Sequence, residues 1–296
     1  MSPEGGLGAK IPWQRLAASS KDEAHIGRVA CFEENAHKLR FFTNKGIGAG
    51  MSVTMSKVIV VGASSGIGAA VAKELAASGA KVALVARRQE ELNLVAASYP
   101  AQFSVYTHDV CAFDEVPALF ERIVAELGGL DTLVYAAGVM PSIAEGEYSF
   151  DKDRMMIDVN LLGAMAWMNP SAARFEAART GTIIGISSIA GERGRRGNPA
   201  YCTSKAALST YLESLRNRAS RYGVNVVTIK PGFIDTAMTR GMKGLLWLIS
   251  AEKASNAIVA MARRGGSPSG FVPSRWALVA FVIRSIPSWL FRRTNV

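Results

Sequence analysis

Short runs of apolar, often β-branched residues recur along the chain from Lys57 onward and alternate with amphipathic segments. Runs this short and this rich in Val and Ile are typical of strands that are buried on both faces. Such alternation predicts an α/β fold with a doubly wound parallel sheet of about seven strands and helices on both faces. The expected strands are KVIVV, KVALVA, FSVYTH, DTLVYAA, GTIIGIS and VNVVTIK, with a late short strand at Gly270 to Pro273 closing the sheet.

The amphipathic segments between these runs carry apolar residues at helical spacing. They predict helices over Gly66 to Ser78, Gln89 to Ala97, Val116 to Leu127, Asp151 to Ala178 and Ala200 to Tyr222.

Residues 1–54 show no sustained period and are rich in Gly and Ser with mixed charge, which predicts a poorly ordered leader. Met51 and Met55 stand directly before the first strand, so translation starting there, with a leader that is not native, is an open alternative. Residues 55–274 then form one domain, and residues 275–296 form a basic and apolar C-terminal segment.

The charge is unevenly distributed. The formal net charge of +10 and the pI of about 9.7 allow attraction to nucleotides, nucleic acid or anionic lipid. From Ala237 to the end there are nine Lys or Arg residues and one acid, Glu252. Because no basic and aromatic module of a known nucleic-acid-binding kind is present, we expect no nucleic-acid partner.

The three cysteines, Cys31, Cys111 and Cys202, are scattered and have no CxxC spacing, which indicates neither a disulfide framework nor a metal site. No apolar run approaches the roughly 18 residues of a spanning helix, and no secretory signal pattern is present. We therefore expect a cytoplasmic protein.

A glycine-rich turn, VGASSGIG, follows the first expected strand and opens the first helix. Gly62 permits a tight turn, while Gly66 and Gly68 let the backbone approach a pyrophosphate at a helix N-terminus. The turn predicts a nucleotide site.

The stretch YCTSK places Tyr201 and Lys205 four residues apart, on one face of a helix. A free tyrosine has a pKa near 10, and a nearby cation stabilises its phenolate and lowers that value. The pair therefore indicates acid–base chemistry.

The GxxxGxG turn and the YxxxK pair occur in order with HDV, YAAG, DVNLLG, ISSIAG and KPGFIDT. Over residues 56–273 the chain resembles the compact, single-domain short-chain dehydrogenase/reductase family. The resemblance implies a Rossmann-like catalytic domain and an NAD(P)-dependent enzyme acting on CH–OH groups.

In the family pattern, Tyr201 is the general acid, Ser188 holds the carbonyl, Lys205 tunes the tyrosine and binds ribose, and Asn160 holds a relay water. Ser187 is the neighbouring candidate for the serine role, but a strand points it to the opposite face. The resemblance gives the cofactor site as Gly62, Ser64, Ser65, Gly66, Ile67, Gly68, Arg87, Arg88, Asp109, Val110, Ala136, Ala137, Gly138, Tyr201, Lys205, Pro231, Gly232 and Thr236.

The end of the second strand decides the expected cofactor. An acidic residue there would suit a bare ribose, whereas Arg87 and Arg88 can pair with a 2′-phosphate. NADPH is therefore favoured over NADH, with a solvated helix start as the alternative role of both arginines. Val61 and Tyr135 depart from the family pattern, which predicts that polar contacts bracing the cofactor floor are absent.

The segment TAMTRGMKGLLWLISAEK offers a flexible apolar lid that suits a hydrophobic ketone; core packing or a dimer contact is the alternative. The C-terminal segment, with Trp276 and Trp289 among arginines, fits either a membrane interface or a helix that closes the pocket or a subunit interface. AGERGRR and the PSWLFRR ending are also similar to polyprenyl-phosphoryl keto-sugar reductases.

Taken with the resemblance, these features predict an NADPH-dependent oxidoreductase that interconverts a carbonyl and a secondary alcohol, on a hydrophobic or lipid-linked ketone. The resemblance also implies a homo-oligomer, a dimer or tetramer. A catalytically idle NADP(H)-binding sensor or scaffold protein is the alternative.

Overall fold

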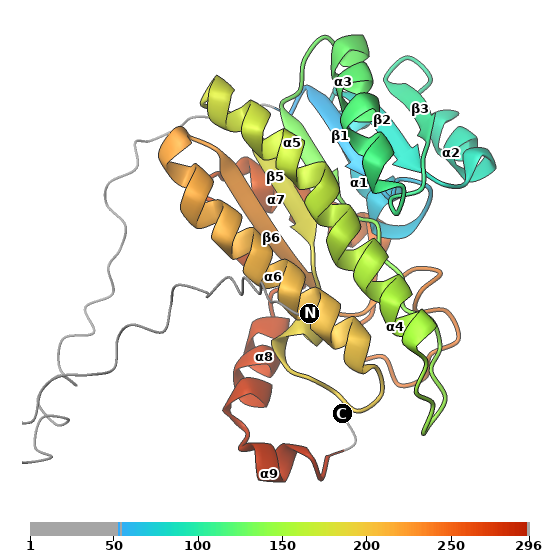
Figure 1. The fold of residues 1–296 in the computed structure, drawn as a ribbon, viewed down its shortest axis with the longest axis vertical. Coiled ribbons are helices and arrows are strands. Elements are labelled where there is room, and N and C mark those ends of the chain that lie inside the picture. Colours follow the sequence, from blue (N-terminus) through green and yellow to red (C-terminus); the bar gives the residue numbers. More distant parts are fainter. Residues whose placement is uncertain (1–52, 54, 295–296) are drawn as a thin grey trace, which may run out of the picture. The chain divides into compact units, whose positions relative to one another are not determined.

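The computed structural model describes residue 53 and residues 55–294, all of which belong to one compact unit, residues 48–296. Apart from Val53, the predicted leader lies outside the described residues. Within them a parallel sheet is covered by helices on both faces (Figure 1).

The sheet has seven strands in the order β3-β2-β1-β4-β5-β6-β9, all parallel, which confirms the predicted Rossmann-like α/β fold. Most of its side chains are buried because helices cover both faces. The strands are β1 (Lys57–Val61), β2 (Lys81–Ala86), β3 (Phe103–Thr107), β4 (Thr132–Tyr135), β5 (Thr182–Ile186), β6 (Asn225–Pro231) and β9 (Ser269–Val272).

The alternation of side chains along β1 divides the core in two. Ile59 and Val61 join one apolar cluster, while Val58 and Val60 join the other. The first cluster is covered by α3 (Val116–Leu127), α5 (Gly163–Ala178) and α6 (Pro199–Ala219), and the second by α1 (Gly66–Ala77), α2 (Gln89–Ala96) and α7 (Ala251–Arg263).

The single helix expected over 151–178 is interrupted. α4 (Phe150–Ile157) and α5 are joined by a π-helical turn, η2 (Asp158–Leu162). π turns are uncommon and often occur at functional sites. The expectation of one regular helix is therefore wrong at its middle, which is where Asn160 lies.

Helix α7 was not among the expected helices, although its buried residues, such as Ala254 and Ile258, have helical spacing. Several short elements complete the chain. The 3₁₀ turns are η1 (Phe113–Glu115), η3 (Ile189–Glu192) and η4 (Ser220–Tyr222), and β7 (Ile234–Asp235) pairs with β8 (Ile249–Ser250).

The C-terminal segment folds as α8 (Trp276–Ser285) and α9 (Ser288–Phe291), separated by Pro287. Figure 1 shows both helices at the end of the molecule where α6 begins. None of the helices in the described part of the chain combines the length and the apolar character that crossing a membrane requires.

Candidate active site

The predicted site residues gather at the carboxyl ends of the parallel strands. The strand order reverses beside β1, with β2 on one side and β4 on the other, so the ends of β1 and β4 flank a topological switch point. Ligands of doubly wound sheets bind at such a point. The segments after β1 to β6, with η2 and the start of α6 (Pro199–Ala219), carry the predicted contacts.

The glycine turn packs directly against the chain that leaves β4. Gly62 has φ +87°, and a Cβ there would lie 2.4 Å from the nitrogen of Ala137. A Cβ on Gly68 would lie 2.2 Å from the carbonyl oxygen of Gly62 and 3.2 Å from the Cβ of Ala136. Glycine is therefore required for this close packing, which leaves the N-terminus of α1, including Ile67, facing the site.

Three donor side chains converge beside the turn. Nη2 of Arg88 donates to the hydroxyl oxygens of Ser64 at 3.0 Å and Ser65 at 3.1 Å. Arg88 also pairs with Glu91 at 3.1 Å, so the carboxylate offsets part of the positive charge of this cluster. This cluster of a guanidinium and two hydroxyls has the chemistry to hold a ribose phosphate.

Arg87 points elsewhere. Its guanidinium lies 3.7 Å from Asp109, and that carboxylate accepts a hydrogen bond from the backbone N–H of Cys111 at 3.0 Å. The two neighbouring arginines thus have different partners, although both are exposed.

Asn160 is fully buried in the π turn and bridges two segments of the site. Its Oδ1 accepts from the backbone N–H of Val139 at 2.7 Å, and its Nδ2 donates to the Val139 carbonyl and to Ser204 Oγ, both at 3.0 Å. A Cβ on Gly138 would lie 3.3 Å from Asn160 Oδ1 and 3.4 Å from Lys205 Nζ. Gly138, Asn160 and Lys205 therefore lie together.

Tyr135 braces the same turn from below. Its hydroxyl donates to the carbonyl of Val159 at 2.6 Å, and a Cβ on Gly163 would lie 2.5 Å from that hydroxyl. The sequence predicted that the polar contacts bracing the cofactor floor in relatives are absent here, and Tyr135 makes this different polar contact instead. The tyrosine thus reaches the π turn and donates to the carbonyl of the residue before Asn160.

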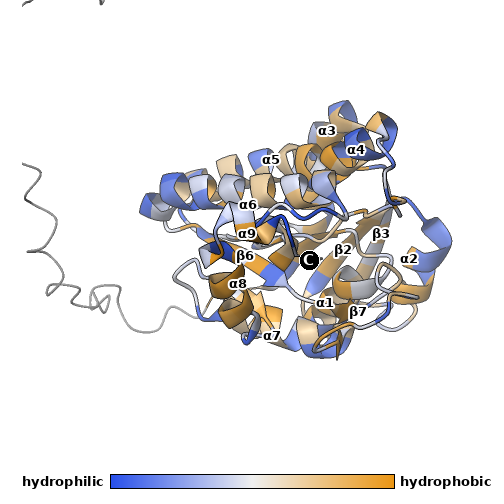
Figure 2. Cartoon of the chain, turned by 90° about the horizontal axis from the view of Figure 1, so that it is seen from below, coloured by the Kyte–Doolittle hydropathy of each residue, from blue (hydrophilic) through white to orange (hydrophobic). Residues whose placement is uncertain are grey.

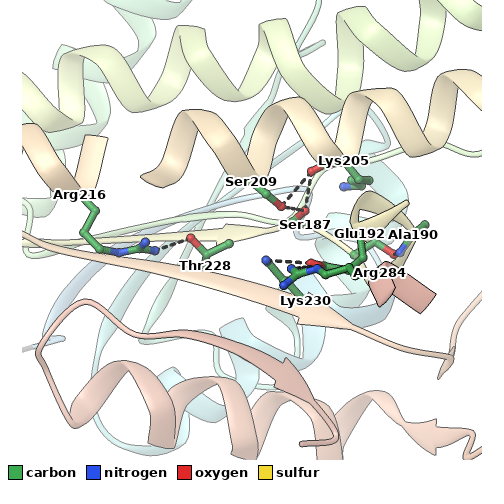
Figure 3. Close-up of polar contacts among 10 residues, drawn as sticks. Ser187, Ala190, Glu192, Lys205, Ser209, Arg216, Thr228, Lys230 and Arg284 are labelled. Atoms are coloured by element: carbon green, nitrogen blue, oxygen red, sulfur yellow. Dashed lines mark hydrogen bonds and ion pairs between the residues drawn. The ribbon is translucent and has the colours of Figure 1, made fainter. Parts of the chain in front are cut away.

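The neighbouring serines after β5 face different partners. Ser188 caps η3 by accepting from the backbone N–H of Ala190 at 3.1 Å, and its hydroxyl lies close enough to Tyr201 to act on the pKa of that phenol. Ser187 Oγ instead donates to the Lys205 carbonyl at 2.8 Å and lies 2.7 Å from Ser209 Oγ (Figure 3). Ser188 is the serine beside the tyrosine, and Ser187 attaches β5 to α6.

Tyr201 and Lys205 are both buried near the start of α6. The Lys205 ammonium lies 5.9 Å from the centre of the Tyr201 ring and donates to the Ile186 carbonyl at 3.0 Å. Asn198 caps the helix by accepting from the backbone N–H of Tyr201 at 3.1 Å, which fixes the position of the tyrosine.

The pKa values of the pair follow their burial. Desolvation raises the pKa of Tyr201, opposed by the hydrogen bond with Ser188 and the charge of Arg195. The expected lowering by Lys205 is therefore wrong in direction, because burial outweighs the neighbouring charges. Desolvation also lowers the pKa of Lys205 from 10.5 to about 8.

The segment after β6 lies against both the glycine turn and the C-terminal helices. A Cβ on Gly66 would lie 3.1 Å from Cγ2 of Thr236, and one on Gly232 would lie 2.0 Å from the Trp276 indole nitrogen. Gly232 also donates its backbone N–H to the Val272 carbonyl at 2.9 Å. The predicted residues Val110 and Pro231 are buried at the same edge of the sheet.

Sequence reasoning assigned no role to Glu192 and Arg193, which follow Ser188. Glu192 is buried between Lys230, at 2.8 Å, and Arg284 (Figure 3). Arg193 donates to the carbonyls of Ile283, at 2.7 Å, and Ile286. The adjacent charges in the loop were a visible signal, but their partners lie about 90 residues away.

Comparison with known proteins identifies the family to which the chain belongs. The short chain dehydrogenase family matches residues 56–244. An uncharacterized oxidoreductase of Staphylococcus epidermidis is 32% identical over 211 residues, covering 71% of this chain and 92% of the relative. An uncharacterized oxidoreductase of Mycobacterium tuberculosis is 30% identical over 247 residues, covering 81% of this chain and 98% of the relative.

Among solved structures, "ElxO with NADP Bound" superposes with a TM-score of 0.66 at 24% identity, covering 74% of this chain and 96% of that one. A "short chain dehydrogenase/reductase family protein" superposes with a TM-score of 0.67 at 22% identity, covering 75% of this chain and 97% of that one. The family match extends over the glycine turn and the YxxxK pair. The chain belongs to the short-chain dehydrogenase/reductase family of oxidoreductases.

Proposed function

We propose that the protein is an NADPH-dependent oxidoreductase that interconverts a carbonyl compound and a secondary alcohol, with a hydrophobic ketone as substrate. The observation that carries this proposal is the meeting of Ser188, Tyr201, Lys205 and Asn160 at the carboxyl edge of the sheet. These four residues supply a proton donor, a carbonyl-binding hydroxyl, a cation and a buried amide in one place.

When bound, NADPH supplies a hydride for the carbonyl carbon. Tyr201 donates its proton to the carbonyl oxygen, so the carbonyl gains one hydride and one proton and becomes an alcohol. The raised pKa keeps this phenol protonated at neutral pH, as a general acid for reduction must be. Ser188 orients the carbonyl by donating a hydrogen bond, and Lys205 provides positive charge beside the phenolate that remains.

The glycine turn and the Arg88 cluster support the choice of cofactor. Gly62 and Gly68 leave no room for a side chain where the pyrophosphate would approach α1. Arg88, Ser64 and Ser65 would hold the 2′-phosphate that distinguishes NADPH from NADH. The NADP named in the ElxO structure agrees with this choice.

Apolar side chains near the site support a hydrophobic substrate. Met238, Met242, Leu246 and Leu248 lie after β7 and are exposed on the loop that leads to β8. Flexible Met and Leu side chains adapt to bulky apolar ligands. An apolar ketone would bury this surface, whereas a small polar one would leave it in water.

The test compares the two neighbouring serines. NADPH oxidation is followed by absorbance on a panel of apolar and polar ketones. Ser188→Ala should lower kcat/KM by about 10² or more, because a group that binds the reacting oxygen is lost. Ser187→Ala should lose some thermal stability and keep kcat/KM within a few-fold of wild type, since its hydroxyl serves β5 and α6.

Equal activity of wild type and Ser188→Ala on every reduced ketone would refute the proposed role of the site. The same panel tests the substrate class, because turnover of only the polar ketones would contradict the apolar assignment.

A further inference from the structure

One face of α8 and the adjoining α9 expose large apolar side chains. Leu278 and Phe281 are 68% and 69% exposed, and with Val282 they have the 3 and 4 spacing of a single helix face. Trp289 is 56% exposed on α9. We call this surface the C-terminal apolar strip; it consists of Leu278, Phe281, Val282, Trp289 and Leu290.

The opposite face of α8 anchors the strip to the domain. Trp276 and Ala280 are buried with Ile189, the residue after Ser188. Trp276 packs edge-on against Phe233 and Trp247, with ring centres 5.6 and 5.5 Å apart. The exposed side chains therefore lie on a helix that is fixed to the fold.

A second anchor is Arg193, which contacts both C-terminal helices. It donates to Ser288 Oγ at 3.3 Å as well as to three carbonyls at the end of α8, and its guanidinium stacks 4.2 Å from the centre of the Phe291 ring. These contacts hold α9 beside α8 and keep Trp289 and Leu290 on the outer surface.

Positive charge surrounds the strip. Arg275, Arg292 and Arg293 are exposed, whereas Arg284 is paired with the buried Glu192. Residues 275–294 contain no Asp or Glu. In Figure 2, which looks from the side of these helices, α8 is drawn mostly in the hydrophobic colour.

We propose that the C-terminal apolar strip docks on an anionic lipid surface. The apolar side chains enter the boundary between headgroups and acyl chains, and the three exposed arginines lie at the level of lipid phosphate. α8 has 10 residues and is about 15 Å long. Because the core of a bilayer is roughly 30 Å thick, the helix is too short to span it and lies along its surface.

A second copy of this chain fits the strip less well. A two-fold contact would place the arginines of both copies close together without an acidic residue of this segment to neutralise them. An anionic bilayer provides both an apolar phase and the opposite charge.

Docking orients the active site without being required for the reaction. α8 packs on η3, which follows Ser188, and Trp276 packs on Gly232. The strip therefore brings the carboxyl edge of the sheet to the lipid. Only the next step rests on the proposed function. If the protein reduces ketones, a ketone dissolved in the membrane becomes the favoured substrate.

The test measures sedimentation of the full chain with vesicles of phosphatidylcholine alone and with 30% phosphatidylglycerol. Wild type should bind the anionic vesicles, and Phe281→Ser should weaken binding about tenfold. Leu94→Ser is the matched control, because Leu94 is 75% exposed on α2. Its binding should equal that of wild type, and thermal melts verify that both variants are folded.

The charge contribution is tested separately. Arg292→Gln with Arg293→Gln should reduce binding to anionic vesicles about tenfold, whereas Lys73→Gln with Lys81→Gln, with the same charge change elsewhere, should have little effect. No vesicle binding by wild type, or equal losses in strip and control variants, overturns the proposal. Dimers that dissociate on Phe281→Ser, without vesicle binding, would assign the strip to a second copy.

The binding experiment is independent of the reaction. Phe281→Ser should keep wild-type kcat/KM on any water-soluble ketone that the protein reduces, so failure of docking and failure of the proposed catalysis give different results.

Discussion

At the scale of single residues, burial decides how the site groups ionise and which of them can be replaced. Tyr201 and Lys205 are both buried, and desolvation is the first cause of the pKa shift of each. The tyrosine is held in its protonated form, while the lysine becomes easier to deprotonate. Both effects oppose charge separation before a substrate carbonyl arrives.

Lys205 should make the stability of the protein depend on pH. Its pKa of about 8 lies below its ordinary 10.5, so the unfolded chain binds more protons between these values and stability rises with pH across that window. The difference in free energy of unfolding between wild type and Lys205→Met should therefore change in favour of wild type by about 2 kcal/mol from pH 7 to 9.5.

Urea unfolding at the two pH values measures this change. Other titrating groups are common to both proteins and cancel in the difference. A difference that stays constant with pH would show that Lys205 keeps its ordinary pKa.

Tyr135 should stabilise the fold through one hydrogen bond. Tyr135→Phe keeps the buried ring but leaves the Val159 carbonyl without its donor, which should cost about 1–2 kcal/mol and lower the Tm by a few degrees. Tyr148→Phe is the control, since that side chain is 99% exposed. Equal Tm values for the two variants would exclude the bracing role.

At the scale of elements, the sequence pattern predicted regular structure well and irregular structure poorly. Runs of Val and Ile identified the strands because both faces of the sheet are buried. The π turn could not be read from DVNLL, because its partners come from the end of β4 and the loop that follows it: Tyr135 for the Val159 carbonyl and Val139 for Asn160.

Side-chain partners across long sequence distances were also beyond the pattern. YxxxK spacing placed Tyr201 and Lys205 on one helix face, but spacing does not report desolvation, so the pKa direction of the tyrosine was missed. The contact of Arg193 with α8 joins residues that only the folded chain brings together.

The junction of β2 and α2 should set the cofactor preference through Arg88 and not Arg87. Arg88→Ala removes the guanidinium beside Ser64 and Ser65 and should weaken NADPH binding about 10- to 100-fold, with NADH binding nearly unchanged. Arg87→Ala should have the smaller effect, because Arg87 pairs with Asp109.

Fluorescence titration of each variant with both nucleotides measures these affinities. An equal loss of NADPH and NADH binding in Arg88→Ala would contradict the 2′-phosphate role.

At the scale of the whole molecule, the fold brings three separate regions to one edge. The glycine turn after β1, the π turn after α4 and the start of α6 carry the residues proposed to bind the cofactor and to donate the proton. The C-terminal helices are attached to the same edge through Trp276 and Arg193. The candidate active site and the proposed lipid-docking strip thus lie at one end of the molecule.

The central claim is that Tyr201 completes the reduction of a carbonyl by hydride from NADPH. The most direct measurement uses NADPH deuterated at the transferred position and mass spectrometry of the alcohol formed from an apolar ketone. Wild type should place one deuterium on the carbinol carbon, and Tyr201→Phe should form product at least about 10² times more slowly. Product without deuterium, or equal rates in both proteins, would contradict the account.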